Sequence, residues 1–366
     1  MIEIHPIPIR TRLLQTLLAT LLFLITTSSY ANPVVTGEYV EEWLDQYVTP
    51  SYLALHQANL ALQGQAHELC DQVSLQALDE MQPYLNQALE ALAYSQAIDG
   101  GPMQSELRNF QLYYWPDRTN LVTKQLGQLL DQPDLLVLQE NGLRHSSVAL
   151  TGYPSLERLL YMPHYREFVI RDQQGPACQY IVAVSDNLVR LTAEITDAWE
   201  NSWRRQLLEP GNSGSLFKEQ NDQVRFVFTN IDVLLTKIIS KKLAKPLASS
   251  VSKAKPKRLE SWRSGHSLIM LKANVRGLTD SLNLTLKPAL IESGGAAKWQ
   301  QIRHEISLID QQLDQLPTPL VAHLDEPKYW QATQQLQVQF TQFQALLQSI
   351  YPSLNVQLGF NAYDGD

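Results

Sequence analysis

Apolar residues recur at intervals of three and four along most of this chain, and that spacing constrains the fold more than any other feature. It places apolar side chains on one face of an α-helix. Four stretches show it most clearly: Val40, Trp43, Leu44, Tyr47 and Val48; Tyr180, Val184, Leu188, Leu191, Ile195 and Trp199; Val227, Ile231, Leu234, Leu235 and Ile238; and Leu336, Phe340, Phe343, Leu346, Leu347 and Ile350. Strand-like alternation is scarce. Helices with one apolar face must bury it against other helices, so the pattern predicts an all-α fold of helical bundles.

A cluster of proline, glycine and serine at residues 209–215 divides the chain into two helical halves. With 366 residues, the chain is long enough for two domains with separate cores. We therefore predict an N-terminal helical-bundle domain over residues 32–209 and a C-terminal one over residues 216–366. One long helix, from about residue 176 to residue 208, is expected to end the first domain.

The first 31 residues have the pattern of a cleaved export signal. Arg10 and Arg12 precede an apolar run over residues 13–25, and a small-polar stretch then ends at Ala31. The run is shorter than the roughly 20 apolar residues that span a bilayer, which disfavours a membrane anchor. We expect cleavage between Ala31 and Asn32, and export across a membrane.

The chain has two cysteines, Cys70 and Cys178. In an exported protein, two cysteines suggest one disulfide, and two buried free thiols are the alternative.

The charge of the chain argues against nucleic-acid binding. Acidic residues exceed basic ones by 37 to 29, and the densest basic run, residues 253–258, is short and interrupted by proline. We interpret that run as a solvated loop and expect no nucleic-acid partner.

Two polar turns, each led by tryptophan, are candidates for a binding site. In the first turn, at residues 114–120, Asp117 is placed to cap the following helix, and Arg118 is available for Glu157 or for an anion. In the second, at residues 260–267, Arg263, Ser264 and His266 are predicted to face a cleft. A structural corner and a solvated helix entry remain the alternatives for these two turns.

Glu157 lies near the start of a short apolar helix that Gly152 and Pro154 open. The apolar neighbours are expected to bury its carboxylate in part, and burial without a partner costs free energy. An arginine or a metal ion would offset that cost, so Glu157 is also the candidate metal ligand; simple stabilisation of the helix dipole is the alternative. No His-Glu-x-x-His spacing occurs, and His145 and His164 flank the helix in sequence.

The chain resembles the imelysin family over nearly its whole length after the signal. Four separated segments carry the match: residues 113–118, 152–161, 260–267 and 358–366. The second segment corresponds to the family's Gly-x-His-x-x-Glu signature. Gly152 and Glu157 match that signature, but Pro154 stands where the signature has its histidine, and a proline side chain has no atom that can bind a metal.

The resemblance implies two four-helix-bundle-like domains with a cleft between them, in a protein of the bacterial periplasm or cell envelope. It also implies a link with iron uptake, in a group labelled metallopeptidases, and so iron or zinc as a possible cofactor. A zinc peptidase needs about three protein ligands and a base. Because the motif here supplies one carboxylate, we assign no catalytic residue.

We therefore favour a non-catalytic periplasmic binding or accessory protein for iron or other metal acquisition. Its cleft would hold a metal ion or an anionic metal chelate through Glu157, Asp117, Arg118, Arg263, Ser264 and His266. The first alternative is a metallopeptidase in which His145, His164 or His266 replaces the missing ligand. The second is a structural or partner-docking protein that binds a component of the outer membrane or cell envelope.

Overall fold

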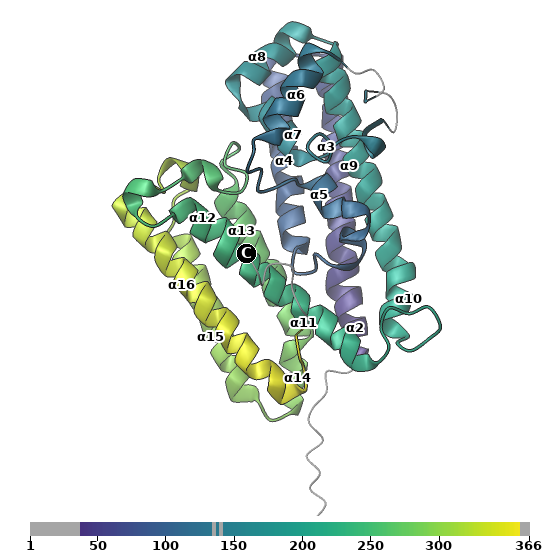
Figure 1. Cartoon of the computed structure of the whole chain (residues 1–366), viewed down its shortest axis with the longest axis vertical. Helices are drawn as coiled ribbons and strands as arrows, with labels where there is room; N and C mark the ends of the chain where they lie inside the picture. The colour runs from purple at the N-terminus through teal and green to yellow at the C-terminus, as the bar shows by residue number, and fades with distance from the viewer. Residues whose placement is uncertain (1–36, 134–136, 139–141, 359–366) are drawn as a thin grey trace, which may run out of the picture.

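A computed structural model describes residues 37–133, 137–138 and 142–358 of the chain (Figure 1). These residues form helices and connecting turns, with no strand in the described ranges, which confirms the all-α prediction. The predicted signal and its Ala31–Asn32 cleavage site lie outside these ranges, as does most of the family-like tail at residues 358–366. In the part of the chain that is described, every helix falls short of the length and apolarity that a membrane span requires.

Long helices form the frame of the first half of the chain. They are α2 (Gly37–Trp43), which continues through the π-helical turn η1 (Leu44–Val48) into α3 (Thr49–Asp71), then α4 (Leu75–Ser95) and α9 (Pro176–Glu200). Helix α3 packs against both α4 and α9. The apolar stripes predicted at residues 40–48 and 180–199 are buried. We call this group of helices, together with the shorter ones below, the first lobe.

Shorter helices cover one end and one side of this frame (Figure 1). They are α5 (Arg108–Leu112), α6 (Leu121–Asp131), α7 (Tyr153–Tyr161), α8 (Pro163–Asp172) and α10 (Ser202–Leu208). The helix predicted from residue 176 to residue 208 is therefore two helices, and that prediction was wrong at Asn201. The Asn201 side-chain amide donates to the Asp197 backbone oxygen at 3.2 Å and to its carboxylate at 2.9 Å. Such bonds to the preceding turn compete with the helical ladder.

The second lobe contains the rest of the chain. Its helices are α11 (Gln220–Lys237), which continues through η5 (Ile238–Leu243) into α12 (Ala244–Leu247), then α13 (Ser267–Leu284), α14 (Leu286–Glu292), α15 (Ala296–Asp314) and α16 (Pro327–Ile350). The stripe at residues 336–350 faces this lobe's core, with Leu346 half-buried. A turn-rich connection over residues 209–219 joins the two lobes, close to the predicted boundary. The division into two independent domains stays a prediction.

The lobes meet where α13 packs against α4. A Cβ atom at Gly277 of α13 would lie 2.0 Å from the backbone oxygen of Tyr94 in α4, so only glycine permits this approach. Hydrogen bonds border the contact: Tyr94 donates to Asp280 at 2.7 Å, and the Trp43 indole donates to Ser281 at 2.8 Å. The interface is therefore close-packed along the helix axis, and its end near residues 96 and 260 supports the site described below.

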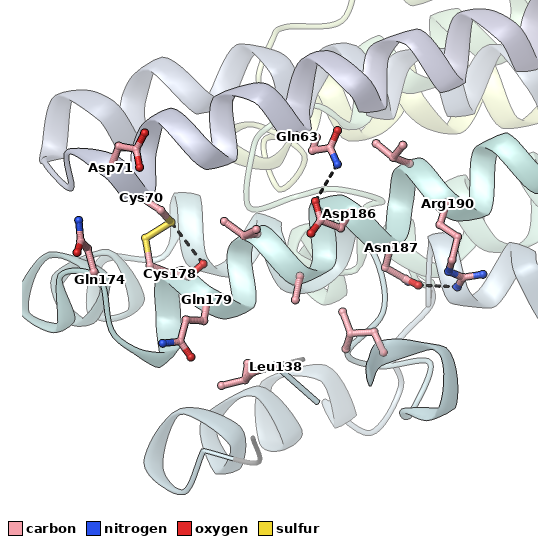
Figure 2. A pocket seen from close by; sticks show the side chains of 14 residues that line it. Gln63, Cys70, Asp71, Leu138, Gln174, Cys178, Gln179, Asp186, Asn187 and Arg190 are labelled. Carbon is pink, nitrogen blue, oxygen red and sulfur yellow. Dashed lines mark hydrogen bonds between the residues drawn. A yellow bond between two sulfur atoms is a disulfide. The ribbon is translucent and has the colours of Figure 1, made fainter. Parts of the chain in front are cut away.

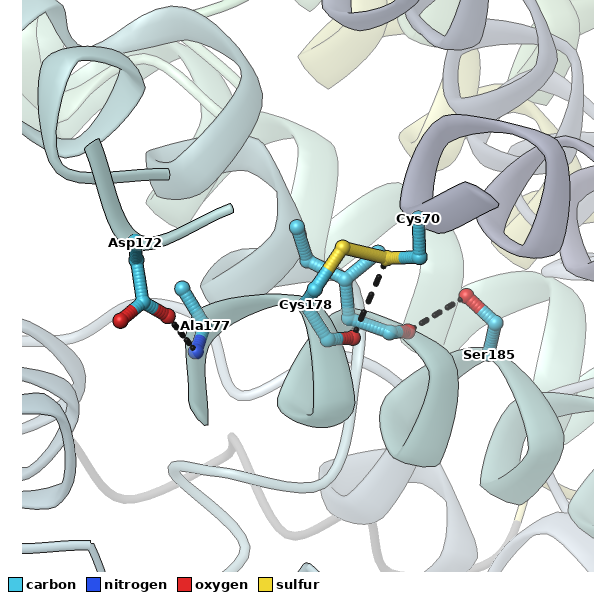
Figure 3. Close-up of a disulfide and its surroundings, with 6 residues drawn as sticks. Cys70, Asp172, Ala177, Cys178 and Ser185 are labelled. Atoms are coloured by element: carbon cyan, nitrogen blue, oxygen red, sulfur yellow. Dashed lines mark hydrogen bonds between the residues drawn. A yellow bond between two sulfur atoms is a disulfide. The ribbon is translucent and has the colours of Figure 1, made fainter. Parts of the chain in front are cut away.

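Cys70 and Cys178 form a disulfide, as predicted, with Cα atoms 5.5 Å apart (Figures 2 and 3). It joins the end of α3 to the start of α9. The Cys70 sulfur also lies 3.4 Å from the Cys178 carbonyl oxygen; a disulfide sulfur has no proton, so this is a packing contact. Nearby, the Asp172 carboxylate accepts the backbone N–H of Ala177 at 2.8 Å and completes the first turn of α9.

Candidate functional site

A pocket of about 540 Å³ lies between the two lobes. On the first lobe it is next to α6 and α7, and on the second lobe it is next to α12 and the start of α13 (Figure 1). We call it the interlobe pocket. Three segments that the sequence singled out, at residues 113–120, 154–158 and 261–263, all contribute to its wall. Its lining residues are Tyr113, Tyr114, Trp115, Pro116, Asp117, Arg118, Asn120, Pro154, Glu157, Arg158, Lys241, Lys245, Lys257, Arg258, Ser261, Trp262 and Arg263.

Helix α7 holds Glu157 in a fixed place. Gly152 precedes this helix, and a Cβ atom there would lie 2.1 Å from the backbone oxygen of Leu112 at the end of α5. This close approach explains why glycine opens the motif. Tyr153 then fastens the helix by donating to Asn59 of α3 at 2.9 Å. Residues 153–160 are all buried, so α7 has little freedom to move relative to the first lobe.

Glu157 bonds across the lobe interface. Its Oε1 atom accepts the backbone N–H of Ser264 at 3.1 Å and lies 3.0 Å from the Ser264 hydroxyl. The residue is only 4% exposed, and burial raises the pKa of its carboxyl above the ordinary value. The Ser264 bonds and the cations of Arg263 and Arg158 oppose that rise. The hydrogen-bond partner of Glu157 is thus Ser264; of the two roles considered for Arg118, pairing with Glu157 is not the one observed.

Asp117 and Arg158 form an ion pair beside Glu157. Asp117 accepts the N–H groups of Leu121 and Val122 at 2.7 and 3.1 Å, which confirms its predicted role as the cap of α6. Its second oxygen lies 3.2 Å from an Arg158 nitrogen. Arg158 is 2% exposed. Burial, with the nearby cation of Arg263, lowers its pKa to about 10.

Further bonds orient the Arg158 guanidinium: it donates to the Thr123 hydroxyl at 2.8 Å and to the Pro154 backbone oxygen at 2.7 Å. The residue at the family's histidine position therefore contributes its carbonyl group to holding an arginine. Sequence reasoning missed Arg158. Its charge inside an otherwise apolar helix was the signal that could have revealed it.

Arg263 covers the other side of Glu157. Its guanidinium lies 4.4 Å from the centre of the Trp262 ring, and its Nε atom is 3.3 Å from the Met162 sulfur. Burial lowers the Arg263 pKa, while the carboxylates of Glu157 and Asp117 favour its charged form. Lys257 also lies over the Trp262 ring, 5.6 Å from its centre. The Trp262 ring thus contacts two cations at the pocket.

Positive charge dominates the pocket wall. The seven cations are Arg118, Arg158, Lys241, Lys245, Lys257, Arg258 and Arg263, and the two carboxylates are Asp117 and Glu157. The sequence did not predict the four cations from residue 241 to residue 258. The basic side chains of residues 253–258 are exposed, as the interpretation of a solvated loop expected; Lys257 and Arg258, in turn η7 (Pro256–Arg258), also line the pocket.

The structure brings most of the predicted site residues together. Asp117, Arg118, Glu157 and Arg263 line the pocket, and Ser264 contacts Glu157. Arg118 is exposed there, with no side-chain partner among the described residues. His266 is buried at the start of α13 and is absent from the pocket wall; burial lowers its pKa, and its Nε2 atom has no hydrogen-bond partner in the described part of the protein.

The side chains around Glu157 do not fit a zinc or iron centre. Across the described residues, no three His, Cys, Asp or Glu side chains are close enough to hold a metal ion. Arginines and a serine surround Glu157 instead. The substitute histidines that the sequence offered, His145 and His164, are exposed residues outside the pocket wall. A catalytic metal needs several neutral or anionic ligands, and cations beside the site oppose its binding.

A second, larger pocket of about 750 Å³ lies beside the disulfide, between α3 and α9 (Figure 2). Two of its three charged side chains have partners, and the third, Asp71, is exposed. Asp186 accepts from Gln63 at 2.8 Å, and Arg190 donates to Asn187 at 2.6 Å and to Glu194 at 2.9 Å. The interlobe pocket, with the exposed cations Arg118, Lys245 and Arg258 and a buried carboxylate, is the better candidate despite its smaller volume.

Replacing Glu157 with glutamine should stabilise the protein at neutral and alkaline pH. Because the folded-state pKa is raised, the wild-type carboxyl contributes favourably below its unfolded value and loses that contribution as pH rises through the folded value. We expect equal stability near pH 4 and an advantage for Glu157→Gln of roughly 1 kcal/mol at pH 8. Urea denaturation at several pH values measures this. A difference that does not change with pH would contradict it.

The fold and this site define a helical protein with a basic pocket between two lobes, and comparison places it in a family. The family model described as imelysin, Peptidase_M75, matches residues 48–351. The chain belongs to the imelysin family.

Several known proteins are similar to this chain over most of their length. Iron-regulated protein A of Synechococcus elongatus is 21% identical over 323 residues, which cover 83% of each chain. An imelysin-like protein from Psychrobacter arcticum superposes with a TM-score of 0.74 at 19% identity, over 89% of this chain and 98% of that one. A putative iron-regulated protein A precursor from Parabacteroides distasonis has a TM-score of 0.66 at 12% identity, over 86% and 94%. At such identities the two structures show that the fold is shared.

Proposed function

We propose that this protein is a non-catalytic binding protein of the periplasm or cell envelope that holds an anionic ligand in the interlobe pocket. The ligand is a metal chelate, and the role is in iron or other metal acquisition. The predicted export signal supports the location. The names of two relatives, both iron-regulated protein A, support the link with iron.

The charge of the pocket wall is the observation that carries this proposal. Seven cations and two carboxylates line the pocket, in a chain whose net charge is −8. Like charges repel one another when they are brought together, and a bound anion converts that repulsion into attraction. Basic side chains concentrated against the overall charge of a protein therefore favour an anionic ligand.

Several of these cations are available to such a ligand. Arg118, Lys245 and Arg258 are exposed, and none of them has a side-chain partner among the described residues. Arginine presents a planar set of donors that matches carboxylate and phosphate groups, and lysine adds a mobile charge. Glu157 and Asp117, in contrast, are engaged with Ser264 and Arg158.

The same wall argues against the metallopeptidase alternative. A bare divalent ion would meet one buried carboxylate flanked by Arg158 and Arg263, with no histidine in the wall. The third possibility, a docking protein for an envelope partner, does not require an enclosed pocket with a buried carboxylate. For these reasons we rank both below chelate binding.

Calorimetric titration of the purified protein tests the proposal. The probes are Fe(II), Fe(III), Zn(II) and Cu(II) as simple ions, and Fe(III) as its anionic complex with nitrilotriacetate. We expect the complex to bind and the simple ions not to bind. In Lys245→Ala/Arg258→Ala, affinity for the complex should fall about tenfold, since each exposed ion pair contributes up to about 1 kcal/mol.

A matched control removes the same charge from the same region. Lys253→Ala/Lys255→Ala deletes two exposed lysines that do not line the pocket, so its affinity should stay at the wild-type value. Equal losses in the two double variants would contradict the pocket assignment. Tight binding of a simple ion that disappears in Glu157→Ala would favour the metallopeptidase instead.

A further inference from the structure

The interlobe pocket combines two kinds of recognition, and together they describe a narrower class of ligand. This inference rests on the proposed function and deepens it. At one place the pocket presents Glu157, a buried carboxylate; around it the pocket presents cations. A ligand that carried only negative charge would satisfy the cations and would be repelled by the carboxylate.

The orientation of Glu157 shows which atom is available. Ser264 approaches Oε1 with both its N–H and its hydroxyl. Both bonds go to Oε1, and among the described residues Ser264 is the hydrogen-bond donor to this side chain, so Oε2 is left for a ligand in the pocket that Glu157 lines. An ionised carboxylate can only accept hydrogen bonds. The ligand group at this place must therefore be a donor, such as a hydroxyl.

The cations surround this acceptor on both lobes. Arg158 and Arg263 lie nearest, close enough to favour the charged form of Glu157. Arg118 comes from the first lobe, and Lys245 and Arg258 come from the second. A ligand with two or more anionic groups can meet several of these residues at once.

The size of the pocket agrees with a small molecule of this kind. Small-molecule sites in proteins occupy about 300–1,000 Å³, and the interlobe pocket has about 540 Å³. Carboxylate oxygens are also groups with which small molecules chelate hard metal ions, so a chelate that leaves one hydroxyl group free of the metal fits as the cargo.

We propose that the interlobe pocket selects a hydroxy-polycarboxylate, whose carboxylates meet the cations of both lobes and whose hydroxyl group donates to Glu157 Oε2. Glu157 is then the residue that sets specificity, and the cations supply most of the affinity. Polycarboxylates without a hydroxyl group satisfy the cations but are fully ionised at pH 8 and offer no donor to Glu157.

Two compounds that differ in one hydroxyl group test this directly. Citrate has three carboxylates and a hydroxyl, and tricarballylate has the same three carboxylates and no hydroxyl. Calorimetry at pH 8 should show citrate binding about tenfold or more tightly, the effect of one hydrogen bond to a charged acceptor. In Glu157→Gln the amide nitrogen replaces the acceptor, so the preference should fall to about twofold or less. Lys245→Ala/Arg258→Ala should weaken both compounds by the same factor.

Other outcomes would overturn the inference and leave the proposed function standing. Equal affinities of the wild-type protein for citrate and tricarballylate would show that the pocket does not recognise the hydroxyl group. Binding of the iron–nitrilotriacetate complex without binding of either polycarboxylate would also exclude this class of ligand. Failure of that complex as well would contradict the proposed function itself.

Discussion

Replacing Lys242 with methionine should lower the free energy of unfolding by about 3–5 kcal/mol, because it leaves a buried carboxylate without its counter-charge. The Lys242 ammonium lies 2.6 Å from Glu260, and the two side chains are 4% and 2% exposed. Glu260 Oε1 has no hydrogen-bond donor among the described residues, so lysine is its main stabilising contact. Guanidinium denaturation followed by circular dichroism measures the change.

The double variant Lys242→Met/Glu260→Gln provides the control. It removes both charges, so most of the lost stability should return, since neutral replacement of a buried ion pair is often nearly neutral in free energy. A double variant as unstable as the single one would show that packing, and not the unpaired charge, is responsible.

The position of this pair explains why its loss should be so large. Lys242 also donates to Gln96 at 3.1 Å and to Asn274 at 2.6 Å, so it connects η5, the end of α4 and α13. Burial lowers the Lys242 pKa, and the carboxylate of Glu260 opposes that effect. Glu260 directly precedes the turn that carries Ser261 and Ser264. The pair therefore stabilises the lobe interface and the wall of the pocket together.

Removal of the disulfide should have an effect of similar size. Cys70 and Cys178 are 108 residues apart in sequence. In the chain-entropy account, a cross-link that closes a loop of this length stabilises the folded state by about 4–5 kcal/mol. We expect Cys70→Ser/Cys178→Ser to lose that amount in equilibrium urea denaturation. Reduction of the wild-type protein should produce the same loss, and the reductant should leave the double variant unchanged. A loss well below this value would indicate that the unfolded chain retains structure.

Features that depend on local pattern could be predicted from the sequence. The spacing of residues 180–199 predicted the buried face of α9, because a helix places residues three and four apart on one side whatever lies around it. Asp117 was predicted to cap α6, since a cap and its helix are neighbours in sequence. Cys70 and Cys178 offered one pairing. Family membership followed from ordered short motifs, such as Gly152 and Glu157.

The local sequence pattern did not predict those features of the site that depend on contacts between residues far apart in the sequence. The sequence offered Arg118 as a partner for Glu157 or for an anion, but Ser264, 107 residues beyond Glu157, is the residue that approaches the Glu157 Oε1 atom. The sequence analysis gave no role to Arg158, because the burial of an arginine depends on which helices cover it. The sequence also did not predict that Lys257 and Arg258, which are exposed, line the pocket, because nothing nearby in sequence indicates where their turn lies.

The sequence by itself therefore determined the helical class, the disulfide and the family of this protein, since each follows from spacing or residue identity within short segments. Only the tertiary structure decided which charges meet. It placed seven cations and two carboxylates around one pocket in a chain of net charge −8, and it placed Lys242 against Glu260. The physical reason is that the energy of a charge depends on distance and on burial, and both are set by how the lobes pack.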